Sequence, residues 1–196
     1  MSRLTLGTVL SLVPMALAAQ VHILPPAQQI ALAVLPLPRE FRAGATVLGY
    51  DASGKLVTLR RGSGPMICLA DDPKQPQFHV ACYHNTMEPF MARGRDLRAH
   101  GVKDPEVDTV RYAEVRSGKI PMPKQAALWM LTGPRSAVNV ATATVGKEVL
   151  PLYEVYLPGA TAASTGLPAS PQPVGPWLMD PGTPKAHIMF TSSMPM

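Results

Sequence analysis

The chain has few of the features that nucleic-acid-binding proteins share. Aromatic residues make up 6% of its 196 residues, and its formal charge of +5 is dispersed. The longest charged region, Met87 to Lys124, contains eight Lys and Arg residues and six Asp and Glu residues, so it is nearly balanced. Nucleic-acid binding depends on a concentrated basic surface with aromatic platforms. We therefore expect no nucleic-acid partner.

Long apolar runs are missing after residue 18. The nearest candidate is residues 30–37 (IALAVLPL), which is short and is broken at Pro36. A helix that crosses a bilayer takes about 20 apolar residues. We expect no membrane span in the chain that remains after residue 18.

Motifs for cofactors and for common nucleophiles are also absent from the sequence. It has no G-x-S-x-G elbow, no complete phosphate loop, no G-x-G-x-x-G fingerprint and no C-x-x-C-H haem site. Each of these motifs places a backbone or a side chain where its chemistry requires it. The sequence thus predicts no cofactor and leaves open whether the protein is an enzyme.

What the sequence does contain is an export signal at its N-terminus. Arg3 gives a positive start, residues 4–13 (LTLGTVLSLV) form an apolar centre, and Ala16-Leu17-Ala18 supplies small residues at the end. This order is typical of a secretory signal peptide that is cleaved after the last small residue. We predict that residues 1–18 are removed and that the mature protein is periplasmic or extracellular.

The pattern of apolar residues after the signal predicts an α+β fold, in which a small antiparallel sheet has about three helices inserted between its strand regions. Residues 19–196 are expected to form a single domain. Nine of the 22 prolines fall from Pro151 onward, so we expect a Pro-rich, irregular C-terminal third that becomes a loop-rich extension from about residue 158. The expected strands are 45–50, 55–60, 66–70, 78–83, 137–144, 149–157 and 186–191, and the expected helices are 25–35, 87–100, 105–117 and 123–132.

The two cysteines, Cys68 and Cys82, are predicted to form a disulfide. An even pair in an exported chain favours a bridge. If residues 71–77 are the loop of an antiparallel hairpin, facing residues have numbers that add up to about 148, and this pair adds up to 150. The alternative is a zinc or copper site formed by His79, Cys82 and His84. Strand alternation argues against that site, because it points His79 away from the other two residues.

His84 and Glu88, together with the distant His187, are the candidate catalytic residues. A histidine backed by a carboxylate can act as a general base. The alternative for Glu88 is a capping box with Asn85, in which the carboxylate returns to the backbone amide at the start of a helix.

Candidate binding residues lie in the C-terminal third. The segment 159–167 (GATAASTGL) is rich in small hydroxyl residues, including Ser164 and Thr165, and Trp177 offers an aromatic anchor. The sequence favours a non-catalytic exported domain that binds a small ligand or an envelope protein. The alternative is a secreted hydrolase or metal-dependent enzyme that uses His84, Glu88 and His187.

Overall fold

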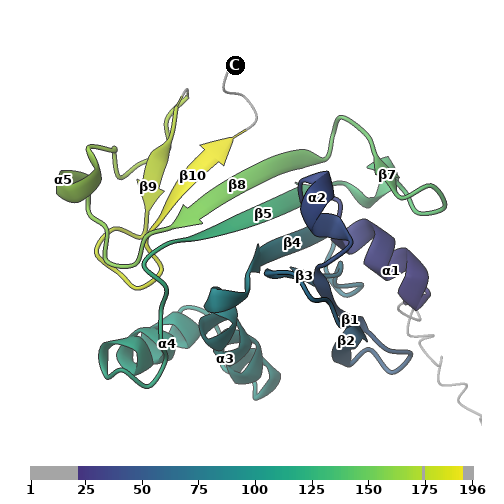
Figure 1. Cartoon of the computed structure of the whole chain (residues 1–196), viewed down its shortest axis with the longest axis horizontal. Coiled ribbons are helices and arrows are strands. Elements are labelled where there is room, and N and C mark those ends of the chain that lie inside the picture. Colours follow the sequence, from purple (N-terminus) through teal and green to yellow (C-terminus); the bar gives the residue numbers. More distant parts are fainter. Residues whose placement is uncertain (1–21, 174, 192–196) are drawn as a thin grey trace, which may run out of the picture.

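The computed structural model describes residues 22–173 and 175–191, so the predicted signal peptide lies outside the described residues. Eight strands form one sheet in the order β2-β1-β3-β4-β5-β8-β10-β9 (Figure 1). Only β1 and β3 run parallel, and the other neighbouring pairs are antiparallel. The fold is mixed α+β as predicted, but the sheet is large and mixed rather than small and antiparallel.

The N-terminal elements match the sequence prediction closely. Helix α1 (Pro26–Ala33) begins at a proline, which tolerates the first turn because its missing N–H needs no partner there. Strands β1 (Thr46–Tyr50) and β2 (Leu56–Arg60) form the expected hairpin. The turn between them is held by Asp51, whose carboxylate accepts from the backbone of Ser53 and Lys55. The short helix α2 (Arg39–Arg42) precedes β1.

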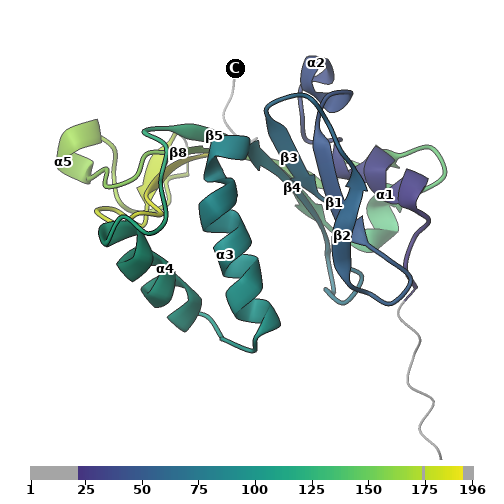
Figure 2. The ribbon, with the colours of Figure 1, turned by 60° about the horizontal axis from the view of Figure 1, so that its bottom comes forward.

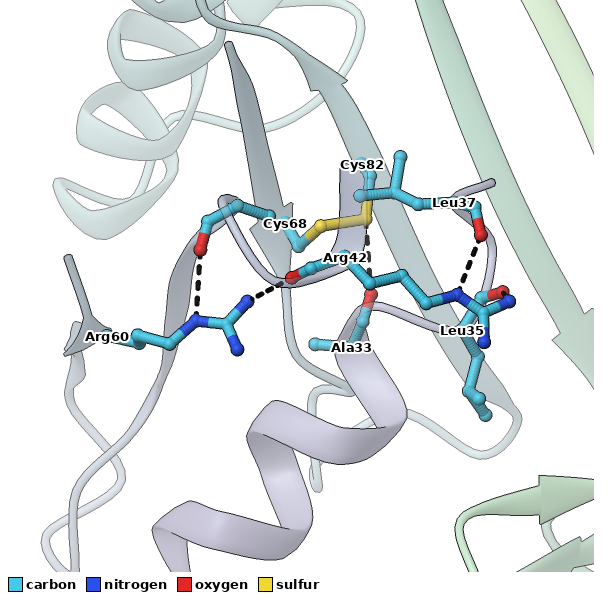
Figure 3. The surroundings of a disulfide bond; sticks show 8 residues. Ala33, Leu35, Leu37, Arg42, Arg60, Cys68 and Cys82 are labelled. Atoms are coloured by element: carbon cyan, nitrogen blue, oxygen red, sulfur yellow. Dashed lines mark hydrogen bonds between the residues drawn. A yellow bond between two sulfur atoms is a disulfide. The ribbon is translucent and has the colours of Figure 1, made fainter. Parts of the chain in front are cut away.

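Strands β3 (Met66–Leu69) and β4 (Phe78–His84) carry the two cysteines. Their register places Cys68 directly opposite Cys82, and the two are bonded, which confirms the predicted disulfide. Both residues are 0% exposed. Figure 3 shows the backbone from α1 to α2 crossing over the bond, with the Ala33 carbonyl oxygen 3.2 Å from the Cys82 sulfur. The bridge is therefore part of the core.

Two arginines hold the covering segment in place. Arg42 donates to the carbonyl oxygens of Leu35 and Leu37, each at 2.8 Å. Arg60 donates to those of Arg42 and Ala45 (Figure 3). Three of these carbonyls lie between elements and the fourth ends α2, so the guanidinium groups bond acceptors at positions where regular backbone pairing stops.

The predicted helix at 123–132 is wrong, because the structure has strand β5 (Ala126–Gly133) there. This strand lies in the middle of the sheet, between β4 and β8 (Leu150–Tyr156). Leu128 packs on one side of the sheet and Leu131 on the other. A strand that is covered on both faces is a continuous apolar run, which periodicity alone does not distinguish from a buried helix.

The predicted irregular C-terminal third is also wrong in part. Strand β8 pairs with β10 (His187–Thr191), which pairs in turn with β9 (Trp177–Met179). The single turn of α5 (Ala162–Thr165) lies in the connection between β8 and β9. The prolines from Pro158 to Pro184 therefore occupy connections, Pro151 lies within β8, and strands β8, β9 and β10 complete the sheet. In place of the predicted strand 137–144, the structure has a small hairpin of two strands with two residues each, β6 (Val138–Asn139) and β7 (Thr144–Val145).

The two faces of the sheet have different covers. Helix α1 and the β6–β7 hairpin cover one face, where two apolar clusters include Cys68, Phe78 and Leu131. Helices α3 (Glu88–Ala99) and α4 (Glu106–Arg116) cover the other face around Tyr83, Phe90 and Tyr156 (Figures 1 and 2). None of the helices within the described residues is long and apolar enough to cross a membrane.

The start of α3 differs from the predicted capping box, and α4 begins without a side-chain cap. Asn85 opens a short 3-10 turn (Asn85–Met87), and its N–H donates to Pro65 rather than to Glu88. Glu88 instead accepts from Tyr83 and Arg95 at 2.5 and 2.6 Å, because both donors converge on it from the packed sheet and helix. The Asp104 carboxylate, just before α4, does not cap this helix and pairs with Arg98 at 3.0 Å. Gly101 follows α3 at φ +85°, as expected after a helix end.

Candidate functional site

A pocket of about 320 Å³ opens beside α1, between the β3–β4 loop and the β6–β7 hairpin. Most of its wall is apolar and belongs to the cluster that α1 and the hairpin form on the sheet. Figure 1 shows α1 and β7 at the same end of the molecule. The wall residues are Ile23, Leu24, Leu32, Pro73, Phe78, Val138 and Val140, and the polar lining residues are His22, Gln29, Tyr50, Asp71 and Arg135.

Gln29 fixes one side of the pocket. Its side-chain amide donates to the carbonyl oxygens of Leu24 and Tyr50 and accepts from the Tyr50 N–H, at 2.7 to 2.8 Å. This buried side chain therefore ties α1 to the end of β1 and uses its own hydrogen-bonding groups in doing so. Gly49 makes the contact possible, because a Cβ there would lie 2.6 Å from the Gln29 oxygen.

Arg135 fixes the opposite side. It donates to the carbonyl oxygens of Asp72 and Gln75, at 2.7 and 2.8 Å, and forms an ion pair with the Asp71 carboxylate. Asp71 also accepts from the His79 N–H at 2.9 Å. A guanidinium group presents its donors in a rigid fork, so one side chain holds several acceptors of the β3–β4 loop at once. Arg135 therefore holds the β3–β4 loop, which forms this side of the pocket, although the two are about sixty positions apart in sequence.

Tyr50 is one of the polar residues that line the pocket. Burial raises the pKa of its phenol to about 12, and the carboxylates of Asp72 and Asp71 add to the rise. The hydroxyl therefore keeps its proton at neutral pH and remains a donor.

The three candidate catalytic residues are not brought together. His84 ends β4, where its ring bonds the Thr86 hydroxyl at 2.9 Å, and Glu88 is held by Tyr83 and Arg95. His187 lies in β10, with β5 and β8 between it and β4. Three strand spacings separate the two histidines by about 14 Å. This arrangement forms no shared acid–base site.

His187 instead belongs to a buried pair beneath α4. Its Nδ1 bonds the Lys185 carbonyl oxygen at 2.7 Å, and its Nε2 lies 3.9 Å from the Glu154 carboxylate. The His187 ring stacks on Tyr156, with centroids 5.1 Å apart. Burial raises the pKa of Glu154, while the charges of His187 and Lys185 oppose the rise.

Glu154→Gln is expected to increase stability at neutral and alkaline pH. Because the folded-state pKa of Glu154 is raised, the favourable contribution of this residue to stability is fully present below its unfolded-state pKa of about 4.3. That contribution is lost as the pH rises through the folded-state pKa. The difference in the free energy of unfolding between variant and wild type should therefore grow from pH 4 to pH 8. Urea titrations across that range measure it. Glu106→Gln, at an exposed site of α4, is the control, and a pH-independent difference for Glu154→Gln would contradict the expectation.

The candidate binding residues of the C-terminal third lie outside the pocket. Ser164 and Thr165 are in α5, where Ser164 forms a capping box with Thr161 and the Thr165 hydroxyl donates to the Thr161 carbonyl oxygen. Trp177 is 7% exposed in β9, and its indole N–H has no partner within the described residues. The hydroxyl groups are thus occupied in local structure, and Trp177 packs in the sheet.

The alternative metal ligands are likewise separated. His79 is exposed on β4, whereas Cys82 faces α1 and is bonded to Cys68. Along residues 22–173 and 175–191, no group of three or more His, Cys, Asp and Glu side chains is arranged to hold a metal ion.

The sequence interpretation missed the residues of the pocket. Asp71 and Pro73 lie in a segment predicted only as a loop, and Tyr50 is the last residue of a hairpin strand. No local motif connects them with Arg135. Comparison with known proteins finds no matching family model, no similar curated protein and no similar solved structure.

Proposed function

We propose that the protein is an exported, non-catalytic domain that binds a small molecule in the pocket beside α1. The observation that carries this proposal is the pocket itself, a mostly apolar cavity of about 320 Å³ whose lining includes a few polar groups. Small-molecule sites in proteins are typically concave, mostly apolar and of at least this volume. The bonds of Gln29 and Arg135 hold both sides of the cavity in place without a ligand.

The proposed export rests on the sequence of residues 1–18 and on the disulfide. Disulfides persist in oxidising compartments, and the Cys68–Cys82 bond is compatible with such a location. Intact mass spectrometry of protein from a periplasmic fraction tests the removal of residues 1–18 and the disulfide together. We expect a chain that starts at Ala19 and gains the mass of two hydrogen atoms on denaturation with reductant. A chain that retains residues 1–18, or one that shows two free thiols before reduction, would contradict this part of the proposal.

Filling the pocket is expected to abolish ligand binding. Val140→Trp places an indole into the cavity, so the uncharged fluorescent probe N-phenyl-1-naphthylamine should bind at least about tenfold more weakly, a loss of about 1.4 kcal/mol. The measurement is a fluorescence titration of the mature protein. Thr144→Trp is the matched control, because Thr144 is exposed on the same hairpin and does not line the pocket. Equal affinity in the two variants, or no binding by the wild type, would refute the proposal.

A further inference from the structure

We propose that the β6–β7 hairpin is a flap over the pocket, which opens as a unit to admit the ligand and is held closed by Arg135. The flap is defined as residues 134–148, which lie between β5 and β8. This inference rests on the proposed function and concerns how a ligand reaches that same site.

The flap forms a wall of the pocket and stands outside the main sheet. Val138 and Val140 line the cavity from the flap, together with Leu32 of α1 and Phe78 of β4. In the described part of the chain, β6 and β7 pair with each other in a separate sheet of two strands. Figure 1 shows this hairpin beyond the ends of β5 and β8. Because a lone two-stranded hairpin is marginally stable, the flap depends on its packing and on its ties to the rest of the protein.

The packing of the flap is shallow. None of residues 134–148, all of which the structure describes, is buried, whereas Val149, directly after them, is 5% exposed. Four half-buried apolar side chains of the flap pack on the cluster around Phe78, namely Val138, Val140, Ala143 and Val145. Segments with few buried contacts open locally at a lower free energy than the whole fold unfolds.

The two ends of the flap lie against each other and form a narrow base. A Cβ on Gly133 would lie 2.7 Å from the Glu148 carbonyl oxygen. The Gly146 N–H donates to the Ala137 carbonyl oxygen at 2.7 Å. Since these contacts close the base within the segment itself, the flap can swing out while β5 and β8 stay paired.

Arg135 joins the flap to the β3–β4 loop. It donates to the carbonyl oxygens of Asp72 and Gln75 and pairs with the Asp71 carboxylate. Within residues 22–173 and 175–191, the other hydrogen bonds of the flap have both partners between residues 134 and 149. The Arg135 side chain is 39% exposed, so salt and water reach this latch. Loss of one guanidinium group would therefore release the flap.

Stopped-flow fluorescence with N-phenyl-1-naphthylamine and the mature protein tests this gating. The observed binding rate of the wild type should level off with rising probe concentration, at the rate of flap opening. Arg135→Gln should raise that limiting rate about threefold to fivefold, the factor that a partly exposed ion pair contributes. Sodium chloride at about 0.5 M should also raise the wild-type rate, because salt screens such pairs, and should affect Arg135→Gln less.

Two further variants separate the latch from a general loss of structure. Asp71→Asn removes the ion pair from the other side and keeps an oxygen for the His79 N–H, so it should raise the limiting rate as Arg135→Gln does. Lys147→Gln is the matched control, because it removes an exposed charge of the flap that does not line the pocket. A wild-type rate that rises linearly with probe concentration, or a limiting rate that neither latch variant changes, would overturn the proposal.

Amide hydrogen exchange tests the flap without a ligand. The amides of residues 138–145 should exchange faster than those of β5 and β8, and faster again in Arg135→Gln. Equal protection of the hairpin and the sheet would contradict the flap. If the probe binds but its rate shows no limit, the flap fails and the proposed function stands. If the wild type binds no probe, the proposed function and the gating both fail, and exchange still decides whether the hairpin opens as a unit.

Discussion

Replacing both Cys68 and Cys82 with alanine is expected to lower the free energy of unfolding by about 3 kcal/mol. The bond closes a loop with a sequence separation of 14, and a loop of this size restricts the unfolded chain by about that amount. For a chain of this length, the midpoint of thermal unfolding should fall by roughly 6 to 12 °C. Differential scanning calorimetry of the mature protein under oxidising conditions gives both values.

The accessibility of the bond provides the control for this prediction. Both cysteines are 0% exposed beneath the segment that Arg42 and Arg60 hold, so dithiothreitol should leave the bond of the native protein intact and reduce it only in denaturant. Reductant in denaturant should have no effect on the double alanine variant. An unfolding midpoint equal to that of the wild type would show that the bond does not stabilise the fold.

Replacing Asp108 with alanine is expected to destabilise the protein by about 3 kcal/mol. Asp108 pairs with Arg111, which is 4% exposed and lies over the Phe90 ring at 3.9 Å, and with Lys185 of the β9–β10 connection at 3.1 Å. Removing one partner of a buried pair leaves the other charge uncompensated, which costs about 3–5 kcal/mol. Urea denaturation at neutral pH measures the loss.

The electrostatics of Asp108 support the direction of that change. Burial alone would raise the pKa of Asp108, but hydrogen bonds from Arg111 and Lys185 outweigh it and hold the pKa below its ordinary value. Asp104→Ala is the matched control, because Asp104 pairs with Arg98 where both side chains are largely exposed. Such a pair contributes about 0–1 kcal/mol. Equal losses in the two variants would mean that the buried position of Arg111 has no energetic consequence.

The sequence predicted the elements whose signals are local. The turn at Asp51 and the proline at the start of α1 each act on neighbouring residues, so their structures could be predicted. Strand β5 could not be, because its apolar run reflects cover on both faces by elements that lie elsewhere in the chain. Glu88 failed as a cap for a related reason, since Tyr83 and Arg95 reach it only after the sheet and α3 have packed.

The pocket could not be predicted because its parts come from the α1 segment and from four other places in the chain. Tyr50 ends β1, Asp71 follows β3, Phe78 begins β4, and Arg135 follows β5. Each has an ordinary local explanation as a strand end, a loop acid, a core aromatic or a surface base. Their shared role depends on the order of strands in the sheet, and that order includes the parallel β1–β3 pair that periodicity does not indicate.

A crystal structure of the mature protein grown with N-phenyl-1-naphthylamine tests the central claim most directly. The proposed function predicts the probe in the cavity beside α1, with its rings against Leu32 and Phe78. Probe bound only elsewhere on the protein, with this cavity filled by water or closed by its own side chains, would contradict it.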